Sequence, residues 1–170
     1  FNDEAVDTLD ARIGQVQDRL GGPMLVENSS GYTAFKASAM SELEFVGRVL
    51  ESADCLLLLD INNLYVNAWN HNFDALEFLR GLPRERVAQM HLAGHDHREH
   101  YLVDAHGSPV VEPVWELYAE AVRLFPDIPV CVEWDRDVPA LDLLLGEVKK
   151  ARDIMAGGQV GSGGEESDAS

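Results

Sequence analysis

The sequence predicts an α/β fold in which a parallel sheet is covered by helices. Continuously apolar runs such as Cys55–Leu59 are typical of strands that are buried in a parallel sheet. Between these runs, apolar residues recur at the spacing of amphipathic helices. The helix–strand unit repeats about every 30 to 40 residues, which favours βα units over an antiparallel arrangement.

The predicted helices follow from this periodicity and from capping signals. Val6 and Ile13 lie on one face of the first helix. Ser41 and Glu44 form a capping box before the second helix, and Pro113 fits the first turn of a later one. The helices are expected at residues 3–20, 42–51, 73–80, 113–125 and 138–155.

Five apolar runs are predicted to be strands, and each one ends in a residue that can bind a metal. The strands are expected at residues 24–26, 55–59, 87–90, 101–103 and 129–132. The polar residues that follow them are Glu27, Asp60, His91, Asp104 with His106, and Glu133. Because the carboxyl ends of parallel strands meet at one face of the fold, we expect these side chains to share one small volume.

The chemistry of this set favours metal ions. Four carboxylates brought together without cations could not all ionise, because repulsion and desolvation raise their pKa values. His91 and His106 add neutral nitrogen ligands. Such an oxygen-rich shell without thiolates suits iron, manganese or zinc in an open catalytic site rather than a structural zinc site. Bridging carboxylates make two or more ions the expected number.

Simpler roles stay open for the individual residues. A polar residue at a strand end can cap a following helix or hold a loop. Asn62 and Asn63 fit either a turn or a contact to substrate or metal. His95 fits a residue that supports a metal ligand, faces the substrate or binds metal weakly. The charged run at residues 96–100 is expected to be a solvated loop, with His97 and His100 at the surface.

The composition of the chain limits the kinds of binding partner and the cellular compartment that we expect. The 170 residues carry 13 Lys and Arg against 30 Asp and Glu, for a formal net charge of −17. Such a surface repels phosphate groups, so we expect no nucleic-acid partner and no binding to an anionic membrane. Cys55 and Cys131 lie in apolar runs and are expected to be buried and reduced in a cytoplasmic protein. The start at Phe1 rather than Met indicates a fragment.

Several consecutive motifs resemble one family. They are Glu27-Asn28-Ser29-Ser30, the run from Leu59 to Val66, His91-Leu92-Ala93-Gly94-His95, Asp104-Ala105-His106 and Glu133-Trp134-Asp135. From Phe1 to about Ala151 the chain resembles the multinuclear non-haem iron-dependent oxidative enzymes related to the methanobactin biosynthesis protein B. The resemblance implies the C-terminal part, about five strands, of a (β/α)8 TIM barrel of the xylose-isomerase-like type.

The resemblance also implies ligands and an activity. The implied metal ligands are Glu27, Asp60, Asn63, His91, Asp104, His106 and Glu133, and the residues expected to act in catalysis are Asp60, Asn63 and His95. The implied reaction is the oxygen-dependent modification of a ribosomally made precursor peptide, commonly at cysteine, by two or three iron ions. Zinc or manganese is the alternative metal. A separate protein that presents the peptide is the expected partner.

Two other classes of function fit the same residues. One is a zinc-dependent hydrolase or sugar isomerase on the same barrel, and the other is a non-catalytic half-barrel that serves protein interaction. We expect a partial-barrel metal-binding domain at residues 1–155 and a disordered, acidic tail rich in Gly and Ser at residues 156–170. Five strands of an eight-stranded barrel leave open sheet edges, so the chain by itself is expected to be unstable or oligomeric.

Overall fold

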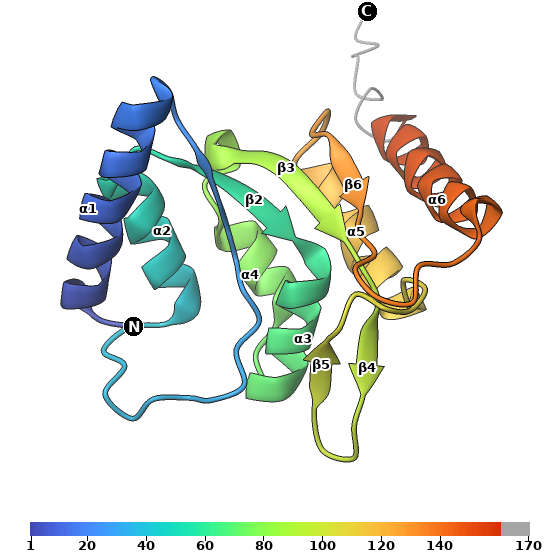
Figure 1. Cartoon of the computed structure of the whole chain (residues 1–170), viewed down its shortest axis with the longest axis horizontal. Helices are drawn as coiled ribbons and strands as arrows, with labels where there is room; N and C mark the ends of the chain where they lie inside the picture. Colours follow the sequence, from blue (N-terminus) through green and yellow to red (C-terminus); the bar gives the residue numbers. More distant parts are fainter. Residues whose placement is uncertain (161–170) are drawn as a thin grey trace, which may run out of the picture.

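A four-stranded parallel sheet forms the centre of the chain in the computed structural model (Figure 1). Its strands lie in the order β1 (Leu25–Glu27), β2 (Leu56–Asp60), β3 (Val87–Leu92) and β6 (Val130–Val132). The structure describes residues 1–160 of the chain, and the side chains of residues 1–157. The parallel α/β arrangement that the sequence predicts is therefore confirmed.

Helices precede or follow each strand of this sheet. Their bounds are α1 (Asp3–Leu20), α2 (Glu42–Ser52), α3 (Ile61–His71), α4 (Ala75–Gly81), α5 (Glu112–Leu124) and α6 (Leu141–Val160), with a 3-10 turn at Arg84–Arg86. Figure 1 shows α1 and α2 at one end of the sheet and α6 at the other. The Ser41 side chain accepts a hydrogen bond from the Glu44 amide (3.1 Å), as the predicted cap of α2 requires.

The two faces of the sheet differ in burial. Leu57 and Leu59 of β2 and Met90 and Leu92 of β3 are fully buried under the helices. Leu58, which alternates with them, is half-buried. Within residues 1–160, helices therefore cover one face of the sheet, as predicted, and leave the other face uncovered. In a closed barrel the second face would be the interior.

The fifth predicted strand is not part of this sheet. Residues Leu102–Asp104 form β5, which pairs antiparallel with β4 (His95–His97) in a separate hairpin. A further parallel strand needs a crossover of about a dozen residues or more. The short segment between β3 and β5 fits only a hairpin. β4 also replaces part of the solvated loop expected at residues 96–100, whereas residues 98–100 are exposed as expected. Figure 1 shows the hairpin projecting from the sheet beside α3.

Helix α3 is absent from the sequence prediction, which expects Asn62 and Asn63 in a turn or in contact with substrate or metal. The Asp60 side chain caps this helix by accepting from the Asn63 amide (2.7 Å). Ile61, Leu64 and Ala68 are buried at helical spacing, and this pattern is the signal that could have found the helix. The helix places Asn62 and Asn63 in its first turn, directly above the end of β2.

Cys131 is exposed, in contrast to the prediction, while Cys55 is buried as predicted. The difference arises because Cys131 is in register with His91, so its side chain lies on the face of the sheet that no helix buries within residues 1–160, whereas Val130 and Val132 pack against the core. Helix α6 extends to Val160, five residues beyond the predicted end of the domain, and the rest of the predicted tail lies outside the described residues. Within residues 1–160, no helix is long and apolar enough to cross a membrane.

Candidate metal centre

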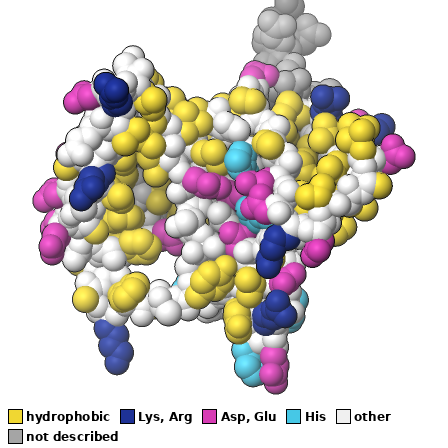
Figure 2. All heavy atoms as spheres, in the orientation of Figure 1, with side chains coloured by type: hydrophobic (Ala, Val, Ile, Leu, Met, Phe, Trp, Pro, Cys, Tyr) yellow, Lys and Arg dark blue, Asp and Glu magenta, His cyan; other side chains and the backbone are white. Residues whose placement is uncertain are grey.

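Four predicted ligands from four different strands converge at one edge of the sheet. Each of Glu27, Asp60, His91 and Glu133 offers one ligand atom, and these atoms all lie within 4.8 Å of one another. The parallel register explains the convergence, because Asp60 and His91 are direct neighbours on β2 and β3. Figure 2 shows carboxylate and imidazole groups gathered at the centre of this face.

His91 lies between the carboxylates of the two edge strands. Its Nδ1 is 2.9 Å from Glu133 Oε2 and 3.9 Å from Glu27 Oε1. Glu133 follows β6, and its amide continues the ladder by donating to the Leu92 carbonyl (2.8 Å). The backbone pairing of β3 with β6 thus sets the distance between this imidazole and this carboxylate.

His106 connects these residues to a second group. Its Nδ1 is 3.5 Å from Glu133 Oε2 and 3.5 Å from Asp135 Oδ2, and its Nε2 is 4.0 Å from Asp60 Oδ2. His106, Glu133 and Asp135 form a second set whose ligand atoms lie within 4.8 Å of one another. Glu133 belongs to both sets, which is the arrangement of a carboxylate that could bridge two ions.

Asp104 and His106 face each other directly. His106 Nε2 lies 2.5 Å from Asp104 Oδ1, so the two groups form an ion pair when the imidazole is protonated. His106 has a φ of 46°, in the left-handed region, so the segment turns at this residue instead of continuing as a strand. Asp104 and His106 thus lie close together, as the sequence predicts, although the backbone turns at His106.

Burial and crowding shift the acid–base behaviour of the centre. Desolvation, helped by the carboxylates of Asp104 and Glu27, raises the pKa of Asp60 to about 7, although the Asn63 amide and His106 lower it. The Glu27 pKa is raised as well, chiefly by desolvation. The neighbouring Asp104 carboxylate raises the pKa of His106 to about 9. In the metal-free chain, therefore, a charged His106 offsets part of the repulsion among the carboxylates.

Two buried oxygen atoms of the centre are suited to a cation. Asp60 Oδ2 and Asn63 Oδ1 are buried without hydrogen-bond partners. Asn63 is otherwise held, since its amide donates to Asp60 and its Nδ2 donates to the Asn28 carbonyl (3.1 Å). Buried oxygen atoms without donors are costly unless a cation binds them. The residues present thus fit a metal ion, and Asn63 fits a weak ligand.

His95 lies outside both ligand sets. Its Nδ1 donates to Asn62 Oδ1 (2.8 Å), and Asn62 Nδ2 donates to Asp104 Oδ1 (3.0 Å). The ring stacks on Tyr65 at 5.4 Å, and desolvation lowers the pKa of His95. A neutral imidazole whose Nδ1 carries the proton keeps a lone pair on Nε2. His95 therefore fits a proton acceptor at Nε2, in an orientation that the hydrogen bond to Asn62 fixes.

The remaining histidines of this region have ordinary surroundings. His97 lies edge-on against Trp69, with ring centroids 5.6 Å apart. The side chain of His100 is 82% exposed beside Glu99. Both residues are on the surface, as the sequence suggests.

Sequence reasoning missed several residues that shape the centre. Asp135 lies two residues after Glu133, which is the same spacing that separates Asp104 from His106, and this spacing could have identified it. Ser30 Oγ donates to Asp104 Oδ2 (3.1 Å), and the Tyr32 hydroxyl accepts from the Asp104 amide (3.1 Å). These two residues lie more than 70 positions from Asp104, and no local pattern in the sequence indicates them.

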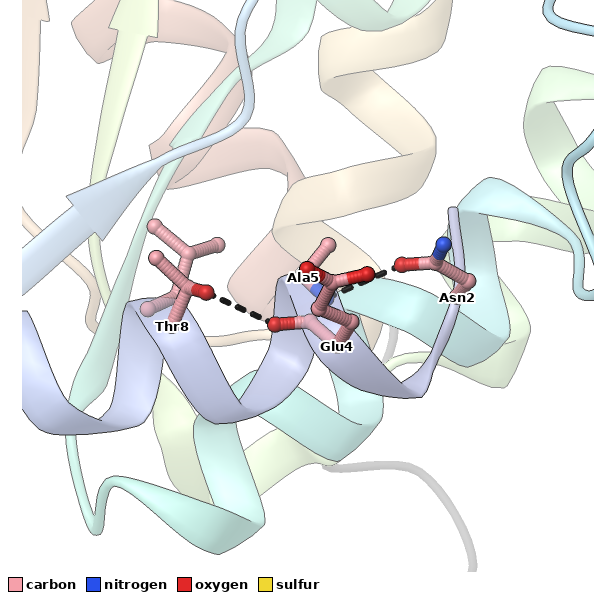
Figure 3. A pocket seen from close by; sticks show the side chains of 5 residues that line it. Asn2, Glu4, Ala5 and Thr8 are labelled. Atoms are coloured by element: carbon pink, nitrogen blue, oxygen red, sulfur yellow. Dashed lines mark hydrogen bonds between the residues drawn. The ribbon is translucent and has the colours of Figure 1, made fainter.

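A separate pocket of about 440 Å³ lies on α1, where Figure 3 shows Asn2, Glu4, Ala5 and Thr8. The dashed lines in Figure 3 mark two hydrogen bonds at the start of α1, from the Ala5 amide to Asn2 Oδ1 and from Thr8 Oγ1 to the Glu4 carbonyl. None of the predicted ligands lines this pocket. The candidate metal centre is therefore a different surface.

A solved structure shares the fold. A crystal structure of the IolI protein with a bound zinc atom aligns at a TM-score of 0.60 with 15% identity, covering 89% of this chain and 55% of that chain. At this identity the likeness concerns the fold alone. The chain has the α/β fold of part of a xylose-isomerase-like TIM barrel, as the sequence predicts.

Relatives with higher identity are about twice as long. A UPF0276 protein of Shewanella loihica is 52% identical over 151 residues, which is 88% of this chain and 54% of the relative. A UPF0276 protein of Acaryochloris marina is 47% identical over 140 residues, 82% of this chain and 51% of the relative. The chain thus spans about half the length of the curated relatives it matches.

A family model matches nearly all of the described chain. It is described as the RiPP precursor modification enzyme MbnB/TglH/ChrH, and it covers residues 1–156. The predicted relationship to the methanobactin protein B group is confirmed. This chain belongs to the MbnB/TglH/ChrH family of RiPP precursor modification enzymes.

Proposed function

We propose that the protein oxidises a ribosomally made precursor peptide at a cysteine residue, with iron at the candidate metal centre and dioxygen as the oxidant. Membership in a family of RiPP precursor modification enzymes supports a peptide substrate. The observation that carries the metal part is the convergence of ligand atoms from four strands within 4.8 Å, next to a second set that shares Glu133.

Two neighbouring ions fit this arrangement. Glu27, Asp60 and His91 would hold the first ion, and His106 and Asp135 the second, with Glu133 between them. Asp104 contacts His106, and Asn63 offers a spare buried oxygen beside Asp60. A shell of carboxylates and imidazoles without thiolates suits iron and leaves positions open for substrate. A third ion is part of the proposal for the whole protein, because this chain spans about half of its relatives.

The chain's own groups would prepare the site for an anionic thiolate. Bound iron would lower the pKa of a coordinating peptide thiol and exchange electrons with dioxygen. Burial raises the pKa of Asp60 to about 7, and a bound cation would favour its ionised form. His95 would accept a proton at Nε2, because Asn62 holds its Nδ1. The stack of His95 on Tyr65 keeps the ring in this orientation.

We also propose a substrate, a partner protein and a cellular compartment. The substrate would be a short precursor peptide, presented by a separate partner protein, and the compartment would be the cytoplasm. The thiols of Cys55 and Cys131 are both free, as the reducing conditions of that compartment require. The charge of −17 supports the absence of a nucleic-acid partner.

Anaerobic purification followed by elemental analysis and a peptide assay tests the proposal. We expect iron in the wild-type protein and an oxygen-dependent mass change in a cysteine-bearing peptide encoded beside the gene. Asp104→Ala and His106→Ala should lose iron and activity together, whereas Asp142→Asn, an exposed position on α6, should keep both.

Other outcomes would separate the competing functions. Zinc without oxygen demand would support a hydrolase or isomerase in place of the oxidase. A wild-type protein that binds no metal would support a non-catalytic module. Unchanged iron content in both Asp104→Ala and His106→Ala would refute their assignment as ligands.

A further inference from the structure

We infer that Gln89 is a positioning residue that directs His91 to bind metal through Nδ1. The inference rests on the proposed function, since it concerns the same metal centre. Gln89 and His91 lie two residues apart on β3, so their side chains share one face of the sheet. The Gln89 amide nitrogen is 3.2 Å from His91 Nε2.

The two nitrogens of His91 have different surroundings. Nδ1 faces the carboxylates of Glu133 and Glu27, at 2.9 and 3.9 Å. Nε2 faces the Gln89 amide on the other side of the ring. An ion held by these carboxylates therefore meets Nδ1, and Gln89 occupies the position from which an outer partner orients a metal-bound imidazole.

A glutamine can serve both states of this imidazole. With its amide nitrogen toward His91, Gln89 donates to Nε2, and Nδ1 carries the proton that goes to Glu133. When a metal takes Nδ1, the ring proton lies on Nε2 and needs an acceptor. A half-turn of the Gln89 amide presents its oxygen there. A leucine would serve neither state, and a glutamate would accept only from the metal-bound form.

The first test is a Co²⁺ titration of the full 170-residue chain, followed by visible absorption. Gln89→Leu should weaken Co²⁺ affinity by about 10- to 100-fold, in line with the loss of an outer partner. Gln89→Glu should bind at least as tightly as wild type, because its carboxylate accepts the Nε2 proton. Gln17→Leu is the matched control: it loses two amide hydrogen bonds, to Ala53 and Met24, away from the centre. Its affinity should equal that of wild type.

The second test reads the ring directly. Long-range ¹H–¹⁵N spectra should show Nδ1–H in metal-free His91, and metal at Nδ1 with Nε2–H in the Zn²⁺-loaded protein. Coordination through Nε2, or equal affinities for wild type and Gln89→Leu, would overturn the inference and leave the metal centre in place. A wild-type chain that binds neither Co²⁺ nor Zn²⁺ would overturn both the inference and the metal part of the proposed function.

Discussion

The side chain of Asn28 forms two hydrogen bonds with the backbone of Asp60. Its Nδ2 donates to the Asp60 carbonyl (3.0 Å), and its Oδ1 accepts from the Asp60 amide (2.9 Å). Asn28 follows β1 and is buried. The amide thus extends the pairing of β1 with β2 by one step and holds the backbone of Asp60 at the metal centre.

Asn28→Ala should therefore cost both stability and metal affinity. Losing the side chain leaves the Asp60 amide and carbonyl unpaired in a buried place, which destabilises the fold by about 2–3 kcal/mol. Urea unfolding measures this loss, and a metal titration measures the change in affinity. Gln17→Ala removes a similar pair of hydrogen bonds at Ala53 and Met24. It should lower stability without changing affinity, and an equal loss of affinity in both variants would contradict the role of Asn28.

Asp60→Asn should stabilise the metal-free protein at neutral pH and abolish its stabilisation by metal. The folded pKa of about 7 lies above the ordinary value of 3.8. Between these values the unfolded chain releases a proton that the folded chain keeps, so stability falls as pH rises from about 4 to 7. Below this window Asp60 contributes no penalty, and above it the penalty is complete.

Asp60→Asn has no ionisable group at this position, so it lacks the loss of stability with rising pH, and its asparagine still caps α3. Denaturant unfolding in EDTA should show a gain of about 1–3 kcal/mol at pH 7.5 and almost none at pH 4. A variant that is less stable than wild type at every pH would show that Asp60 is not strained in the metal-free protein.

His106 should produce a second pH dependence of stability, which arises from its favourable interaction with Asp104 rather than from burial. Its folded pKa of about 9 lies above the ordinary 6.5, because Asp104 favours the charged ring. The stability that it contributes is complete below about pH 6.5 and is lost as pH rises through 9. Metal-free wild type should therefore lose stability over this range in thermal unfolding. His106→Gln should not show that loss, and a parallel decline in both proteins would assign it to another group.

Gly94→Ala should disrupt the turn between β3 and the hairpin. A Cβ at Gly94 would lie 2.1 Å from the Ser108 carbonyl oxygen, a backbone atom that cannot move aside cheaply. The Gly94 carbonyl also accepts from the His106 amide (3.0 Å), so the displacement would reach the metal centre. We expect a loss above about 3 kcal/mol together with weaker metal binding.

Gly47→Ala provides the contrast. Nothing lies within 4 Å of a Cβ at Gly47 in α2, so this variant should be stabilised by about 0.5–1 kcal/mol. Thermal unfolding of both variants decides the point. Comparable stabilities for Gly94→Ala and wild type would show that the turn can rearrange.

The chain alone should self-associate. Within residues 1–160, β1 and β6 each have a single neighbouring strand, and α6 exposes Leu141, Leu143 and Leu145. Open edges and an exposed apolar stripe favour association. Sedimentation should give a mass above 18.8 kDa that falls towards the monomer in Leu141→Lys with Leu145→Lys. A monomer that unfolds cooperatively with a full metal complement would contradict this.

The sequence predicts most elements because their signals are local. Ser41 with Glu44 identifies the cap of α2, and the apolar run at Cys55–Leu59 identifies β2. Helix α3 was missed because its first turn carries Asn62 and Asn63, which favour turns when read without their neighbours. The hairpin was assigned to the wrong sheet because an apolar run does not reveal the direction of its partner.

The sequence by itself determined which side chains end the strands, and parallel strands place such residues on one face. It therefore predicted that Glu27, Asp60, His91 and Glu133 would meet. Only the tertiary structure decided how they meet: that Glu133 is shared, that Asp135 joins it, that Asp104 is held by Ser30 and Tyr32, and that His91 presents Nδ1. These choices depend on distances of a few ångströms between segments that are far apart in the chain, which no local pattern of residues encodes.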